Sequence, residues 1–151
     1  ANTTWIDNQQ VILGTSSDTR LYHNGSHTYM DHYTGNIYIR DNSTTRFTFE
    51  RTTGNFTASG DVAAFSDVAL KTNIRTIDSA LDKVLNMRGV YFDKDGKAST
   101  GVIAQEIEKV LPEVVNDGDR YKSVAYGNIV GILIEAIKEL NEEIKTLKEQ
   151  G

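Results

Sequence analysis

The sequence contains no cysteine, a single proline and no long apolar run, and these absences exclude several classes of protein. Without cysteine the chain has no disulfide framework, no thiolate metal site and no cysteine nucleophile. No apolar stretch approaches the ~18 to 20 residues that a transmembrane helix needs, so we expect no membrane insertion. A formal net charge of -5 leaves no basic stripe to neutralise phosphates, so nucleic acid is not an expected partner.

Lysine is missing from residues 1–65, and this absence marks a boundary in the chain. The same residues contain one glutamate, Glu50, whereas every lysine lies from Lys71 onward. They also hold twelve of the sixteen threonines and nine of the thirteen aromatic residues, an enrichment typical of strands. We therefore divide the chain into two domains, residues 1–65 and residues 66–151.

Residues 1–65 have the pattern of short, half-buried strands. Residues 36–40 and 46–50 alternate apolar and polar side chains. Turn-forming residues interrupt the strand-like runs at positions 24–25, 34–36, 41–43 and 53–55. Because short strands have few local contacts and many unpaired edges, we expect this segment to fold slowly and to aggregate readily. It is the kind of segment that a folding aid would serve.

Residues 66–151 show a mixed pattern that becomes helical. Asp78 is expected to cap a helix whose apolar face is Leu81, Val84 and Leu85. Further along the chain we expect a hairpin turn at 93–96, a helix over 103–111 that Pro112 ends, and a tight turn at 116–119. The fold class is therefore α+β, with a β-rich segment followed by a mixed domain.

The final helix, expected over about residues 123–150 with Ser123 as its cap, carries a heptad repeat. Its a and d positions are Val130, Leu133, Ile137, Leu140, Ile144 and Leu147. β-branched residues at a with leucine at d favour a dimer, but Ile134 and Ala136 widen the apolar face and suit a larger bundle. The pattern predicts an oligomeric coiled coil without fixing the number of chains.

The glutamates of this last helix are expected to form a solvated face. They are Glu135, Glu139, Glu142, Glu143 and Glu149.

A serine and a lysine stand at the compositional boundary. Ser66 and Lys71 are five residues apart and could form a nucleophile and base pair if burial lowers the pKa of the lysine. The spacing alone is common and equally describes a capping serine beside a solvated lysine.

Residues 66–150 resemble the C-terminal intramolecular chaperone domain of phage tail spikes and tail fibres, the endosialidase-type autoprocessing family. The resemblance is carried by Ser66-Asp67, Leu70-Lys71-x-x-Ile74, residues 101–107, residues 111–115, residues 123–126 and residues 134–141, in the order that the family has them. Residues 1–65 are not covered by it and would be the distal segment of the fibre or spike.

The resemblance implies a homotrimer in which this domain folds the preceding fibre segment of the same chain and then releases itself. It implies a self-cleaving serine peptidase, with Ser66 as nucleophile, Lys71 as general base and the cut between Ser66 and Asp67. An N-to-O acyl shift at Ser66 would break the Phe65–Ser66 bond instead. Asp67 either orients Lys71 or polarises the cut bond, or it is a turn residue. The implied location is the virion tail fibre or spike, assembled in the host cytoplasm, with the chaperone part released after cleavage.

Two alternatives remain open from the residues. The domain can be a trimerisation module of a fibre that is never cut, and residues 1–65 can be a receptor- or glycan-binding tip.

Other candidate sites have a plainer interpretation. His23, His27 and His32 suggest a metal site, but surface positions are favoured because no carboxylate or cysteine stands at ligand spacing. Residues 93–96 begin like a calcium loop but lack the later ligands, which favours a hairpin turn. Gln105 and Glu106 are expected to start a helix and not to enter a shared site. We expect no metal and no cofactor.

Overall fold

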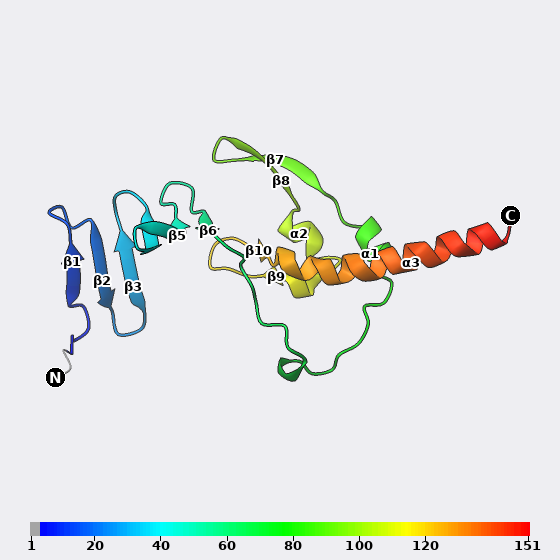
Figure 1. The fold of residues 1–151 in the computed structure, drawn as a ribbon, viewed down its shortest axis with the longest axis horizontal. Helices are drawn as coiled ribbons and strands as arrows, with labels where there is room; N and C mark the ends of the chain where they lie inside the picture. Colours follow the sequence, from blue (N-terminus) through cyan, green and yellow to red (C-terminus); the bar gives the residue numbers. More distant parts are fainter. Residues whose placement is uncertain (1–3) are drawn as a thin grey trace. The chain divides into compact units, whose positions relative to one another are not determined.

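The computed structural model describes residues 4–151, which form two compact units. One unit ends at Ser66 and the other spans Asp67–Gly151. The first contains strands only and the second contains strands and helices (Figure 1), so the α+β fold class is confirmed.

The first unit consists of two antiparallel three-stranded sheets that follow one another along the chain. The strands of the first sheet, in order, are β1 (Gln10–Leu13), β2 (Thr19–His23) and β3 (Thr28–His32). Those of the second are β4 (Ile37–Asp41), β5 (Thr44–Phe49) and β6 (Phe56–Ala58). The strand predicted at 36–40 is confirmed as β4, which starts and ends one residue later. The strand predicted at 46–50 is confirmed as β5, which starts two residues earlier and ends one residue earlier. The predicted turn segments separate these strands, and Gly25, Gly35 and Gly54 have positive φ angles there.

The second sheet has one apolar face. Its register places Ile37, Phe49 and Phe56 in one row across the three strands, and Ile39 and Phe47 in the next row with Ala58. The ring centroids of Phe49 and Phe56 lie 5.0 Å apart. Even so, Phe47, Phe49 and Phe56 stay 40%, 45% and 48% exposed. None of the described residues of this unit is buried, so its apolar face lacks a covering layer within one chain.

The second unit is built around a contact between two helices. These are α1 (Ala80–Leu85) and α3 (Ile129–Glu149). Ala80, Ile132 and Ala136 are buried at this contact. Half-buried residues packed around them are Ile77, Leu81, Val84, Met87, Leu111 and Ile129.

The elements between α1 and α3 are short. A hairpin joins β7 (Val90–Lys94) to β8 (Lys97–Gly101) through Asp95 and Gly96, which have φ angles of 52° and 74°. The hairpin interpretation of residues 93–96 is therefore confirmed. Helix α2 (Ala104–Ile107) follows, then a 3₁₀ turn at Pro112–Val114 and a small ladder of β9 (Val115–Asn116) with β10 (Ser123–Val124).

Several details of the predicted helices and turns were wrong. The helix expected over 103–111 spans only Ala104–Ile107, and Leu85, expected on the apolar face of α1, is exposed. Asp78 does not cap α1, because the N-cap position is Ser79, in a left-handed conformation. Ser123 does not cap the last helix, because it lies in β10 and α3 starts only at Ile129, after a 3₁₀ turn at Tyr126–Asn128. The tight turn at 116–119 is a longer loop, since β9 pairs Asn116 with Ser123.

Among residues 4–151, no helix is long and apolar enough to cross a membrane.

Candidate functional site: the segment after Ser66 and the open face of the last helix

The segment that carries the predicted dyad is a single 3₁₀ turn, Val68–Leu70, followed by a loop. Asp67 precedes the turn, and its Oδ1 accepts a hydrogen bond of 2.8 Å from the Ala69 N–H. Lys71 follows it, and its backbone N–H donates to the Val68 carbonyl at 3.0 Å. Asp67 therefore serves as a turn residue, one of the three roles considered for it.

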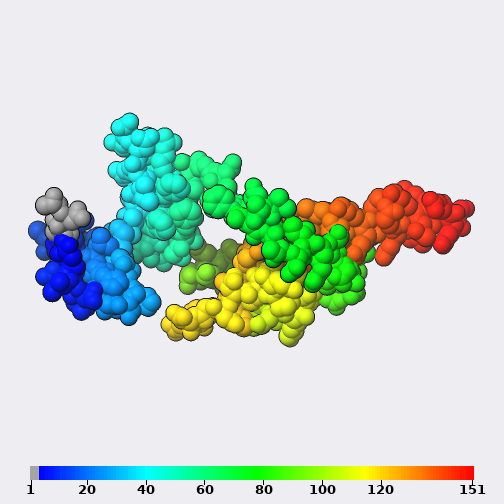
Figure 2. Space-filling model, turned by 90° about the horizontal axis from the view of Figure 1, so that it is seen from below, coloured from blue at the N-terminus to red at the C-terminus, as the bar shows by residue number. Residues whose placement is uncertain are grey.

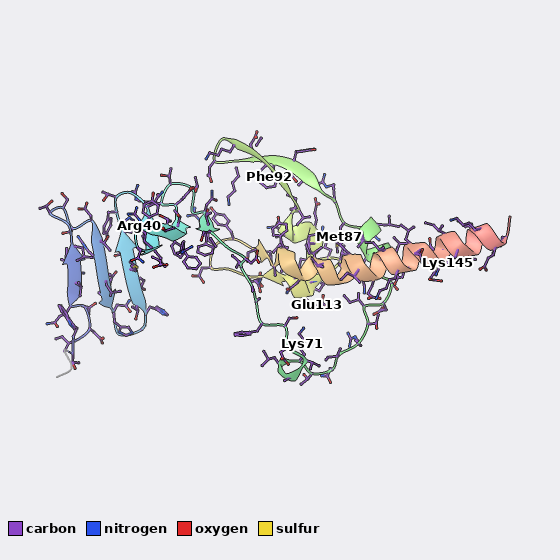
Figure 3. The ribbon with its side chains drawn as sticks, viewed as in Figure 1. Arg40, Lys71, Met87, Phe92, Glu113 and Lys145 are labelled. Carbon is purple, nitrogen blue, oxygen red and sulfur yellow. The ribbon has the colours of Figure 1, made fainter. Side chains whose placement is uncertain are left out.

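Ser66 and Lys71 stand on either side of this 3₁₀ turn, so the chain keeps them close in sequence and in the same short loop. Both side chains are exposed. Figure 3 labels Lys71 on this loop, away from the α1–α3 contact near Met87. Their pairing as nucleophile and base stays a prediction.

The same segment leaves its apolar side chains in solvent. Phe65 is 96% exposed, Val68 and Leu70 are each 69% exposed, and Ile74 is 65% exposed. Every residue from Asp67 to Thr76 is exposed, and Ile77 is the first that packs against the core. A lysine accepts a proton near neutral pH only when burial or a neighbouring cation lowers its pKa. A single chain therefore does not bury the segment as this chemistry requires.

Helix α3 has two apolar faces of different character. Ile132 and Ala136, 0% and 4% exposed, pack against α1. All six predicted heptad positions are instead exposed, from 41% for Leu133 to 69% for Leu147. We call the set Val130, Leu133, Ile137, Leu140, Ile144 and Leu147 the open seam. From Asn141 onward every residue is exposed, and this part of the helix runs clear of the rest of its unit (Figure 2).

Glu139 joins the two helices through its carboxylate. The Ala80 N–H donates to Oε1 at 2.9 Å and the Leu81 N–H donates to Oε2 at 2.7 Å. These hydrogen bonds from Leu81 and Ala80 hold the pKa of the Glu139 carboxyl below its usual value. The prediction that Glu139 belongs to a solvated face was therefore wrong. The signal was its spacing, because residues 132, 136 and 139 lie on one face of a helix.

Ion pairs fix the short elements around this contact. The Arg88 guanidinium donates from Nε to Glu106 Oε2 at 3.1 Å and from Nη2 to Oε1 at 2.5 Å. This pairing lowers the pKa of Glu106 and raises that of Arg88. Gln105 and Glu106 lie in α2, as predicted, and Glu106 has a structural partner.

Lys122 forms a second such link. Its ammonium donates to Glu108 at 2.8 Å and to Asp117 at 2.5 Å, which ties the β9–β10 loop to the end of α2. The hydrogen bonds that Lys122 donates to Asp117 and Glu108 raise its pKa, so this lysine is held in its charged form.

The histidines have local partners in the first unit. His23 Nδ1 lies 3.0 Å from Asp7 Oδ1, His32 Nδ1 lies 2.9 Å from Thr19 Oγ1, and the His27 ring contacts Tyr29 edge-on. Within residues 4–151, no group of three histidine or acidic side chains is arranged to hold a metal ion.

Comparison with known families shows what the second unit is similar to. Residues 66–116, which hold the exposed segment, α1, the hairpin and α2, match the family described as chaperone of endosialidase. Together with the relatives below, this match supports a chaperone-type domain like those of phage tail fibres.

The relatives with similar sequences are long tail fibre proteins named Gp37. The protein of Enterobacteria phage Ox2 is 35% identical over 130 residues, covering 78% of this chain and 46% of the relative. That of Enterobacteria phage K3 is 36% identical over 95 residues, covering 55% of this chain and 8% of the relative. That of Salmonella phage S16 is 36% identical over 108 residues, covering 59% and 14%. The chain thus spans less than half the length of each of these relatives.

Proposed function

We propose that residues 66–151 act as an intramolecular chaperone that assembles three copies of a tail fibre, folds residues 1–65 and then releases itself by cleavage beside Ser66. The observation that carries this proposal is the open seam of α3. Six large apolar side chains in heptad register are exposed on one face, while the adjacent face is already packed on α1. Such a seam is stabilised by burial against copies of itself.

The β-rich unit also needs other copies of the chain to cover its apolar face. The apolar face of the β4–β5–β6 sheet is uncovered within one chain, and sheets with one apolar face need a second layer. Three copies brought into register by the seam would supply one another's second layer. The chaperone domain would thereby fold the fibre segment in front of it.

The exposed dyad segment gives a reason for coupling cleavage to assembly. In a single chain every residue from Asp67 to Thr76 is exposed, whereas a lysine needs burial or a neighbouring cation to act as a base near neutral pH. Burial of Phe65, Val68, Leu70 and neighbouring groups between chains would exclude water from the segment and favour the neutral amine. Assembly would then switch on the reaction, and loss of the chaperone would leave the fibre kinetically trapped.

The net reaction consumes one water and breaks one peptide bond. In the favoured cut, the C–N bond between Ser66 and Asp67 breaks, the Ser66 carbonyl carbon gains an oxygen, and the Asp67 nitrogen leaves as an amine after protonation. Lys71 Nζ takes the proton of the attacking group and passes one to the leaving nitrogen. A hydroxyl that attacks its own carbonyl would form a strained β-lactone, so this cut needs the Ser66 hydroxyl of another chain as the attacking group, and water then hydrolyses the resulting ester. An N-to-O shift would instead cut Phe65–Ser66.

Two variants test the dyad. Freshly expressed wild-type protein is expected to give two bands and Ser66→Ala and Lys71→Ala one band each, all in trimeric material. The first residue of the C-terminal fragment, Asp67 or Ser66, identifies the bond that is cut. Intact wild-type trimers would refute the proteolytic step.

The open seam also supports a second candidate, a trimerisation module that is never cut, because the seam requires no catalytic residue. Intact trimers that keep full stability on Ser66→Ala substitution favour this candidate. Receptor or glycan binding by residues 1–65 stays a prediction, and binding of the assembled first unit to host-surface glycans tests it.

A further inference from the structure

Helix α1 does not supply its own N-terminal cap. It has only six residues, too few to be stable in isolation, and its N-cap residue Ser79 makes no side-chain hydrogen bond to the first turn. The φ angle of Ser79 is 49°, a left-handed conformation that costs energy for a residue other than glycine. Contacts from elsewhere in the unit must therefore stabilise the first turn of α1.

Glu139 supplies such contacts from a distant part of the chain. Its two carboxylate oxygens each accept one N–H of the first turn, from Ala80 and Leu81, which lie 59 and 58 residues away in sequence. These N–H groups have no partner inside the helix, and charge-assisted hydrogen bonds are the stronger kind. The lowered pKa of Glu139 agrees with this arrangement.

Glu139 lies on the α1-facing side of α3, within the same helical turns as residues of the open seam. Ala136, one turn before it, is buried against α1, whereas its sequence neighbour Leu140 and nearby Ile137 belong to the open seam. Any event that orders α3 along the seam therefore also orders the carboxylate that holds α1.

The other end of this connection is the dyad segment. Residues 67–76 run without a buried residue into Ile77 and then into the capped start of α1. The Lys83 ammonium, on α1 itself, donates to the Asp78 carbonyl at 2.7 Å and fixes the last residues of the segment to the same helix. The start of α1 is thus the anchor for the loop that carries Lys71.

From these contacts we propose that Glu139 is a positioning residue, which couples the ordering of the α3 seam to the placement of the Ser66–Lys71 segment. This proposal rests on the proposed cleavage function. Glu139 is assigned no role at the cut bond itself, and acts through its hydrogen bonds to the first turn of α1. This role explains why Glu139, on a helix with several exposed glutamates, faces α1 instead of solvent.

The test compares Glu139→Gln with two matched variants in full-length protein. Glutamine offers one acceptor oxygen in place of two and places an amide donor against an N–H group, so it breaks the two-point contact with little change in volume. Glu142→Gln makes the same chemical change at an exposed site on the same helix, where Glu142 pairs only with Asn141 and Lys145. Val84→Ala weakens the α1–α3 packing without touching the carboxylate.

The first measurement is the single-turnover rate of cleavage within assembled trimers, with each variant at a temperature where its trimer content is complete. We expect Glu139→Gln to slow cleavage on the order of tenfold to a hundredfold, as loss of positioning does. Glu142→Gln should cleave at the wild-type rate, and Val84→Ala should cleave faster than Glu139→Gln. Equal rates for Glu139→Gln and Glu142→Gln, or equal slowing by Val84→Ala at matched thermal stability, would overturn the proposal.

The second measurement separates this inference from the cleavage proposal. Hydrogen exchange of Ser66→Ala trimers, with and without Glu139→Gln, reports the order of residues 67–81 in uncut protein. We expect the Glu139→Gln substitution to make amide exchange in residues 67–81 faster. It should leave the protection of the seam residues after 140 unchanged. If wild-type protein is never cut, the cleavage proposal fails, but the exchange measurement still tests the coupling. Unchanged exchange in residues 67–81 on Glu139→Gln substitution refutes the coupling.

Discussion

At the scale of single residues, two carboxylates accept backbone N–H groups at the start of a turn or helix, one from a neighbour in sequence and one from a distant segment. Asp67 accepts from the N–H of Ala69, two positions along the chain, and Glu139 accepts from the first turn of a helix that lies far before it in sequence. The first contact follows from local sequence, because aspartate commonly caps short turns. The second depends on tertiary packing, so no local pattern around Asp78 or Ser79 reveals it.

The carboxylate of Glu139 gives a pH dependence with a definite sign. Its pKa is lowered in the folded unit, so the stability that it contributes is complete above the unfolded value of about 4.3 and is lost as the pH falls through the folded value. At pH 7 the wild-type protein should melt at a higher temperature than Glu139→Gln. The difference should shrink below about pH 4.3. Lys83 and Asp78, whose charges also act on the pKa of Glu139, are common to both proteins. A difference in melting temperature that stays constant with pH would contradict the assignment.

At the scale of secondary-structure elements, local patterns were enough for the strands and the hairpin but not for the ends of the helices. Turn chemistry predicted the breaks around β4, β5 and the β7–β8 hairpin, because these depend on residues such as Gly96 that adopt positive φ angles. The start of α3 was misplaced, because Ser123 pairs in a ladder with Asn116 and cannot also cap a helix. Sequence spacing gave the heptad positions of the open seam, and the structure showed which other face of α3 is buried.

The two faces of α3 should respond differently to truncation. Ile132→Ala removes a fully buried side chain and should cost ~2–5 kcal/mol of unfolding free energy, which lowers the melting temperature at every protein concentration. Ile137→Ala removes an exposed seam residue, so it should weaken association instead. Its loss in melting temperature should diminish as the protein concentration rises. Thermal unfolding over a range of concentrations checks both, and identical concentration dependence would contradict the division of faces.

At the scale of the whole molecule, the two units differ in how much of their core one chain supplies. The second unit buries side chains such as Ile107 and Ile132, whereas none of the described residues of the first unit is buried. The sequence signalled this asymmetry through the shift from threonine-rich to lysine-containing composition near Phe65. It could not show that the apolar sheet face around Phe47 and Phe56 would remain half exposed.

The first unit should therefore depend on the second to fold. Residues 1–66 expressed alone should aggregate, because their apolar sheet face has no cover and their strand edges are unpaired. The same residues produced as part of the full chain should remain soluble and trimeric after the C-terminal part is removed. Light scattering after size exclusion checks both samples, and a soluble, monomeric and folded fragment 1–66 would show that the chaperone is not needed.

The central claim is that assembly through the open seam drives cleavage beside Ser66. The most direct measurement is the intact mass of freshly assembled protein followed over time, for the wild type and for Ile137→Asp, which places a charge in the seam. The account predicts that wild-type trimers convert to two fragments, with the C-terminal one starting at Asp67 or Ser66, while the Ile137→Asp chain stays monomeric and intact. Wild-type trimers that keep the full mass, or monomeric Ile137→Asp that is cut at the wild-type rate, would contradict it.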